Sequence, residues 1–69
     1  MEKSINIKEI KNKINILCNT IVKIGKEENL QSWIEISEKW RNESDDYIYK
    51  IKIYEQKLLD LYKKANMLF

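Results

Sequence analysis

The sequence has no proline, no histidine, one glycine and one cysteine among its 69 residues. Without proline, no position in the chain is forced to stop a helix. A single cysteine cannot form an internal disulfide, and a lone thiol without histidine is a poor start for a zinc site. The sequence therefore predicts no metal site and no cofactor, and it leaves the packing of apolar side chains to hold the fold together.

Catalytic motifs are also missing. One glycine is too few for a glycine-rich phosphate loop, and no histidine is present to activate Cys18 as a nucleophile. A chain of this length has little room for a substrate pocket. We therefore expect a protein that is not an enzyme, without catalytic residues, in which Cys18 is a small buried residue.

Long apolar runs are absent too. No stretch approaches the ~18 apolar residues of a membrane-spanning helix, so no contact with a membrane is expected. The first ten residues mix charged side chains with isoleucine and lack the apolar centre of a signal peptide. A free thiol is normal in the reducing cytoplasm, and a cytoplasmic protein is the resulting expectation.

Apolar residues recur at alternating steps of three and four, which keeps them on one side of a helix. The first series predicts a helix over residues 5–24, a turn over residues 25–29 and a helix end at Gly25; it contains Ile7, Ile10, Ile14, Leu17, Ile21 and Ile24. The second series predicts helical structure over residues 30–68; it contains Leu30, Trp33, Ser37, Trp40, Ser44, Tyr47, Ile51, Tyr54, Leu58, Leu61, Ala65 and Leu68. The two series predict an all-α fold in a single helical domain over residues 1–69.

The second series allows two architectures. Residues 42–46 are rich in Asn, Ser and Asp, which favour helix caps over helix interiors. A break there gives a three-helix bundle. Without a break, the chain is an antiparallel helical hairpin whose long second helix leaves the apolar residues beyond position 51 uncovered. Either the chain folds back over them or a second copy covers them, so we expect a homo-oligomer, with a dimer favoured.

The charges are unevenly distributed along the chain. Residues 1–26 carry six lysines against two glutamates, residues 27–46 two basic against seven acidic side chains, and residues 47–69 five lysines against two acids. An acidic middle between two basic arms suits segments that fold back on one another. The high content of isoleucine, lysine and asparagine (12, 12 and 7 residues) suggests an A+T-rich genome, such as that of a low-GC bacterium or a phage.

Aromatic side chains give the most specific functional signal. Trp33 and Trp40 are one heptad apart and alternate with Ser37 and Ser44, a pattern that lets a neighbouring helix approach closely in a core. Trp and Tyr also dominate the energetics of protein interfaces. The residues predicted to mediate interaction are therefore Trp33, Trp40, Tyr47, Tyr54, Leu58 and Leu61. We expect a non-catalytic helical interaction module, a small regulator, adaptor or inhibitor of the kind that phages or mobile elements encode, binding a protein partner or itself.

Two alternatives remain at this stage. Lysines of the first helix could bind nucleic acid, namely Lys3, Lys8, Lys11, Lys13 and Lys23. The acidic middle and the single arginine disfavour that function, because arginine is the usual reader of bases.

The other alternative comes from the segment Ile34-Glu35-Ile36-Ser37-Glu38-Lys39-Trp40-Arg41, followed by Tyr47. It resembles the Ser-Gln-Glu-Leu-Asp signature of small helical-hairpin phosphatases that act on the aspartyl phosphate of sporulation response regulators. Arg41 stands where that family has the aspartate. The resemblance implies a helical hairpin and dephosphorylation of a response regulator.

Overall fold

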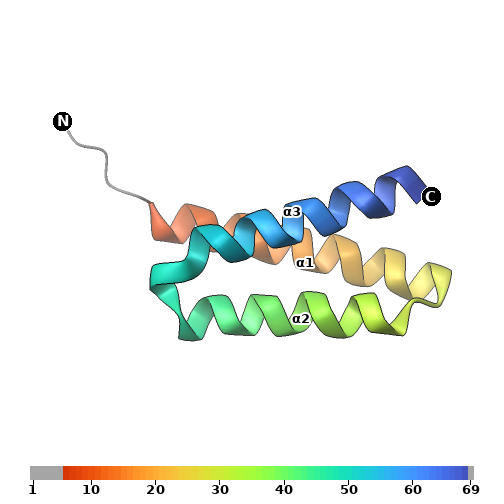
Figure 1. The fold of residues 1–69 in the computed structure, drawn as a ribbon, viewed down its shortest axis with the longest axis horizontal. Coiled ribbons are helices and arrows are strands. Elements are labelled where there is room, and N and C mark those ends of the chain that lie inside the picture. The colour runs from red at the N-terminus through yellow and green to blue at the C-terminus, as the bar shows by residue number, and fades with distance from the viewer. Residues whose placement is uncertain (1–5, 69) are drawn as a thin grey trace.

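A computed structural model describes residues 6–68, and within them the chain forms three α-helices and one 3₁₀ turn (Figure 1). The elements are α1 (Ile7–Glu28), α2 (Gln31–Asp46), η1 (Ile48–Lys50) and α3 (Ile51–Leu68). The all-α prediction is confirmed, and of the two architectures left open the three-helix bundle is the one that forms.

Helix α1 is the centre of the bundle. It packs against both α2 and α3, which contact each other less extensively. The chain reverses after α1 and again after α2, so α2 runs antiparallel to both neighbours while α1 and α3 run parallel (Figure 1). The bundle is elongated and thin, with extents of 45, 22 and 14 Å.

Helix α1 is longer than the sequence predicts. Its first turn is capped by Asn6, whose Oδ1 accepts a hydrogen bond from the Glu9 amide at 3.1 Å; the predicted start at residue 5 lies outside the described residues. The predicted end at residue 24 and turn over 25–29 need correction, since the helix continues to Glu28. It ends at Asn29, which adopts a left-handed conformation (φ 63°, ψ 42°). The Leu30 amide then donates to the Gly25 carbonyl at 2.7 Å, a hydrogen bond typical of a Schellman helix end.

Gly25 has a packing role rather than a capping role. It is buried inside α1, and a Cβ atom at this position would lie 2.6 Å from Cγ1 of Ile34 and 3.2 Å from the Leu30 carbonyl oxygen. A glycine here therefore allows the start of α2 to approach α1 more closely than any side chain would permit.

The second reversal comes one residue later than the predicted break. Residues 42–46 form the last turn of α2, where the Ser44 hydroxyl donates to the Arg41 carbonyl at 2.6 Å. Tyr47 leaves the helical conformation (φ −118°, ψ 70°), and the Lys50 amide donates to its carbonyl at 2.8 Å. This turn folds α3 back onto the other two helices, so the chain itself covers Ile51, Tyr54, Leu58 and Ala65, while Ile53 and Met67 remain exposed.

The core combines aliphatic side chains of α1 and α3 with small side chains of α2. The buried apolar residues are Ile10, Ile14, Cys18, Ile21, Ile51, Tyr54, Leu58 and Ala65. Helix α2 contributes Ser37 and Ser44, which have 0 and 1% of their surface exposed. Each serine hydroxyl is satisfied by a carbonyl of its own helix, so it can be buried without the cost of an unpaired polar group.

Candidate interaction surface

Both tryptophans lie on α2, and Trp40 lies at the seam between α2 and α3. Trp33 and Trp40 are half-buried and pack against the edge of the core, while Ser37, between them in the sequence, is fully buried. The predicted alternation of large and small residues is therefore present. The small residues allow helix contact, and the tryptophans keep part of their surface accessible to a partner.

One lysine of η1 and one of α3 pack over aromatic rings on this side of the bundle. Lys57 Nζ lies 5.4 Å from the ring centres of both Trp40 and Tyr54. At the turn, Lys50 Nζ lies 5.7 Å from the ring centre of Tyr47 and 5.8 Å from that of Tyr49. Both arrangements fall within the ~6 Å range of cation–π attraction.

The residues that make these contacts belong to two series with a spacing of seven residues. Trp33, Trp40 and Tyr47 are spaced by seven residues towards the turn, and Lys50, Lys57 and Lys64 are spaced by seven residues away from it. Trp40 pairs with Lys57 and Tyr47 with Lys50, while Trp33 and Lys64 continue the two seven-residue series in the sequence. We call these six residues the aromatic–lysine row.

Two of the predicted interaction residues belong to the interior. Leu58 has no exposed surface, and Tyr54 is 6% exposed. The Tyr54 hydroxyl donates to Glu43 Oε1 at 2.9 Å. Burial, reinforced by this hydrogen bond to a carboxylate, raises the pKa of Tyr54 above its ordinary value. A partner that docks on the folded chain would not reach either side chain, whereas Trp33, Trp40, Tyr47 and Leu61 retain accessible surface.

Two exposed isoleucines beside the row were not among the predicted interaction residues. Ile36 lies between Trp33 and Trp40 at helical spacing and is 37% exposed; Ile53 lies between Lys50 and Lys57 and is 53% exposed. The signal for Ile53 was its position off the main apolar series, which indicates a second apolar side of α3. We define the α2–α3 face as the aromatic–lysine row together with Ile36, Ile53 and Leu61.

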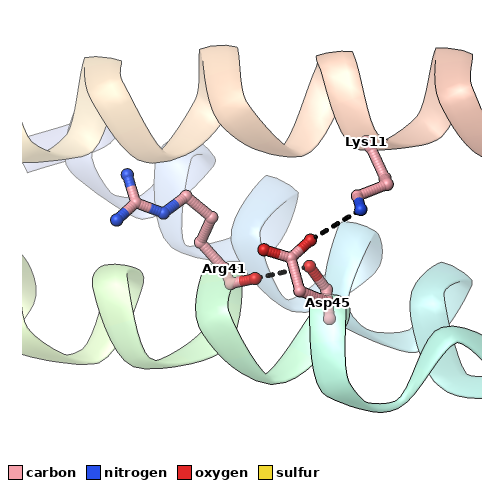
Figure 2. A network of polar contacts seen from close by, with 4 residues as sticks. Lys11, Arg41 and Asp45 are labelled. Atoms are coloured by element: carbon pink, nitrogen blue, oxygen red, sulfur yellow. Dashed lines mark hydrogen bonds and ion pairs between the residues drawn. The ribbon is translucent and has the colours of Figure 1, made fainter.

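The opposite side of α2 meets α1 through a polar contact. Lys11 Nζ and Asp45 Oδ1 are 2.9 Å apart, and Figure 2 shows Lys11 reaching across from α1 while the Arg41 guanidinium points away from Asp45. The two ion-paired side chains are 40% and 54% exposed, so the pair is expected to contribute no more than about 0.2–1 kcal/mol. It helps to align the helices but offers no recess for a ligand.

The buried thiol and serine have no access to solvent. Cys18 is fully buried, and burial raises its pKa despite a contact with the Ser37 hydroxyl. Ser37 is the serine of the segment that resembles the phosphatase signature, and its hydroxyl donates to the Ile34 carbonyl at 3.0 Å. Neither group can meet another protein at the surface of the bundle.

Two further kinds of feature are absent from the part of the chain that the structure describes. Among residues 6–68, no group of three or more Cys, Asp or Glu side chains is arranged to hold a metal ion. No helix in this range has the length and apolar character needed to cross a membrane.

Comparison with known proteins finds no matching family model, no matching curated protein and no matching solved structure. Function is therefore inferred from the geometry of this chain alone.

Proposed function

We propose that the protein is a non-catalytic helical interaction module that binds a protein partner through its α2–α3 face, as a small regulator, adaptor or inhibitor. The observation that carries the proposal is that both tryptophans lie on one side of α2, half-buried at the edge of the core, while Ile36 on α2 and Ile53 on α3 are exposed. Interfaces draw most of their binding energy from a few such aromatic residues held by a rigid scaffold.

The chemistry of the face favours a protein over a nucleic acid. Single-stranded nucleic acids bind by stacking bases on open aromatic faces. Here Lys57 packs over the ring of Trp40, and Lys50 packs over those of Tyr47 and Tyr49. Ile36 and Ile53 add exposed apolar surface beside the lysines, which suits the apolar side of a partner helix or loop.

The test uses substitutions that leave the core intact. A tagged chain is used to isolate a partner from the native host, and the partner's affinity is then measured by titration with purified proteins. The double variant Ile36→Ser/Ile53→Ser changes only exposed side chains of the α2–α3 face. We expect it to weaken binding roughly tenfold or more, which corresponds to about 1.4 kcal/mol or more.

The matched control is Ile7→Ser, which alters an isoleucine of α1 that is 39% exposed and lies outside the α2–α3 face. It should bind the partner as the unchanged chain does. Circular dichroism should show the same helix content for all three proteins. Equal affinities for the double variant and the control would refute the proposed surface.

A further inference from the structure

A second apolar surface lies between α1 and α3. It is a groove of about 270 Å³, lined by Lys13, Ile16, Leu17, Glu55 and Leu59. Helix α2 contributes no lining residue, so the groove is separate from the α2–α3 face. At about 30 Å³ per water molecule, the groove has room for roughly nine waters, which is ample for one branched aliphatic side chain.

The groove lies beside an apolar side chain that protrudes from α1. Ile16 forms part of the rim and is 64% exposed, more than the other described isoleucines of the chain. A single exposed isoleucine is common by itself and needs no explanation. An isoleucine that stands next to a hollow lined by Leu17 and Leu59 gives the same patch both a protrusion and a recess.

The mouth of the groove carries one charge of each sign. Lys13 Nζ and Glu55 Oε2 are 3.9 Å apart, at the outer limit of an ion pair, and the Lys13 side chain is 67% exposed. The lysine is therefore only loosely held by the carboxylate of its own chain. It has freedom to pair with a carboxylate presented from outside.

We propose that this groove is the contact surface between two copies of the chain, related by a two-fold axis. A two-fold contact joins a patch to itself, so the patch must be self-complementary. Ile16 of each copy enters the groove of the other, and Lys13 of each copy faces Glu55 of the other. A patch that binds a different protein needs only a groove or a protruding side chain, and a charge of one sign. This patch carries the groove and the protruding Ile16, and both Lys13 and Glu55, so it can pair with an identical patch.

The small size of the core supports a second copy of the chain as the partner. Among the residues whose burial the structure describes, 6–67, eight apolar side chains are buried. A core this small supplies only ~3–5 kcal/mol unless something reinforces it. Association with a second folded copy adds stability, because only the folded state binds.

The first experiment measures the mass of the pure chain by sedimentation equilibrium from micromolar to millimolar concentrations. We expect the mean mass to rise from 8.4 kDa towards twice that value. Ile16→Glu places a charge in the apolar contact and should raise the dissociation constant roughly tenfold or more. Ile36→Glu, on the α2–α3 face, is the matched control and should leave dimerisation unchanged.

The second experiment tests the two-fold pairing with Lys13→Glu and Glu55→Lys. Each variant alone should dimerise more weakly, because like charges then face each other twice across the axis. In an equimolar mixture, a chain with negative side chains at positions 13 and 55 can pair with a chain that has positive side chains at both positions. The mean mass of the mixture should therefore exceed that of either variant alone. Pairing within one chain cannot produce this rescue, because neither variant retains an opposite-charge pair at these positions.

Three results would overturn the inference: a wild-type chain that remains a single copy at every concentration, loss of dimerisation by Ile36→Glu but not by Ile16→Glu, or a mixture no heavier than its components. Circular dichroism confirms that each variant remains helical. The inference does not depend on the proposed function, since it concerns another face and is tested on the chain alone.

Discussion

Lys57 Nζ lies 5.4 Å from the ring centre of Trp40, across the seam between α3 and α2. The same nitrogen lies equally close to the ring of Tyr54. The Lys57 ammonium group thus contacts one aromatic ring on each helix and links α3 to α2.

Removing this cation should loosen the seam. We expect Lys57→Gln to lower the free energy of unfolding by about 0.5–1 kcal/mol, the range for a cation–π contact at an exposed site. Urea unfolding followed by tryptophan fluorescence measures the change, since both tryptophans lie in α2. Lys52→Gln, in the same helix, is the control, and an equal loss in both variants would contradict the contact.

Alanine at position 25 should destabilise the protein, although alanine is the better helix former by about 1 kcal/mol. The added Cβ would lie 2.6 Å from Ile34 Cγ1, and overpacking of this kind typically costs about 1–3 kcal/mol. We therefore expect Gly25→Ala to lower the free energy of unfolding by about 1 kcal/mol.

The matched background for this substitution is Ile34→Ala, which removes both Ile34 atoms that the new Cβ would meet. In that background Gly25→Ala should be clearly less destabilising, because only the 3.2 Å contact with the Leu30 carbonyl oxygen remains. If Gly25→Ala had the same effect with and without the Ile34 side chain, steric conflict would not be the cause.

Asn29 ends α1 with a φ of 63°, a conformation that costs most residues about 1–2 kcal/mol. Asn29→Ala should therefore lower the midpoint of thermal unfolding, by about 4–8 °C per kcal/mol for a domain of this size. Asn29→Gly should equal or exceed the unchanged chain, because glycine adopts this conformation without a steric cost. Equal midpoints for the two variants would argue against a left-handed residue at this position.

Tyr54 should make the protein sensitive to alkali. Its pKa is raised first by burial and then by donation to Glu43, so its folded value exceeds its unfolded value of about 10. The stability linked to the neutral hydroxyl is fully present below the unfolded pKa and is lost as pH rises through the folded pKa. The free energy of unfolding should thus fall above pH ~10, and less steeply in Tyr54→Phe.

Tyr49→Phe is the control for this pH dependence, since Tyr49 is 81% exposed. It should follow the unchanged chain over the whole titration. All other titratable groups are common to both variants, so their contributions cancel from the comparison. Identical slopes for the two variants would show that Tyr54 does not contribute.

The sequence predicted the apolar sides of the helices well, because burial of these side chains is what stabilises the bundle. Ile10, Ile14 and Ile21 are buried as the first series requires. Leu17 lies at the edge of the core, and its neighbour Cys18 takes the fully buried position. Both α2 and α3 pack on α1, so the buried side of α1 includes more residues than one apolar series and faces the space between α2 and α3.

The helix ends and the interaction surface were harder to predict. Glycine is typical of helix ends, but Gly25 is needed for the close approach of Ile34, a contact that no local sequence pattern reveals. Tyr54 and Leu58 belong to the same apolar series as Trp33 and Trp40, yet they are buried because the turn at Tyr47 folds α3 back onto the bundle. Which members of a series remain exposed is decided by tertiary packing, not by spacing.

The parallel alignment of α1 and α3 makes their contacts the longest-range ones in the bundle. Helices α1 and α2 need only the reversal at Asn29 to meet, whereas contacts between α1 and α3 require both reversals, because α2 separates them in the sequence. Bundles rich in local contacts fold within microseconds to milliseconds. The α1–α3 contacts therefore have the largest sequence separation of the three helix pairs and carry the largest loop-closure cost, and the apolar side of α3 stays accessible to other chains until they form.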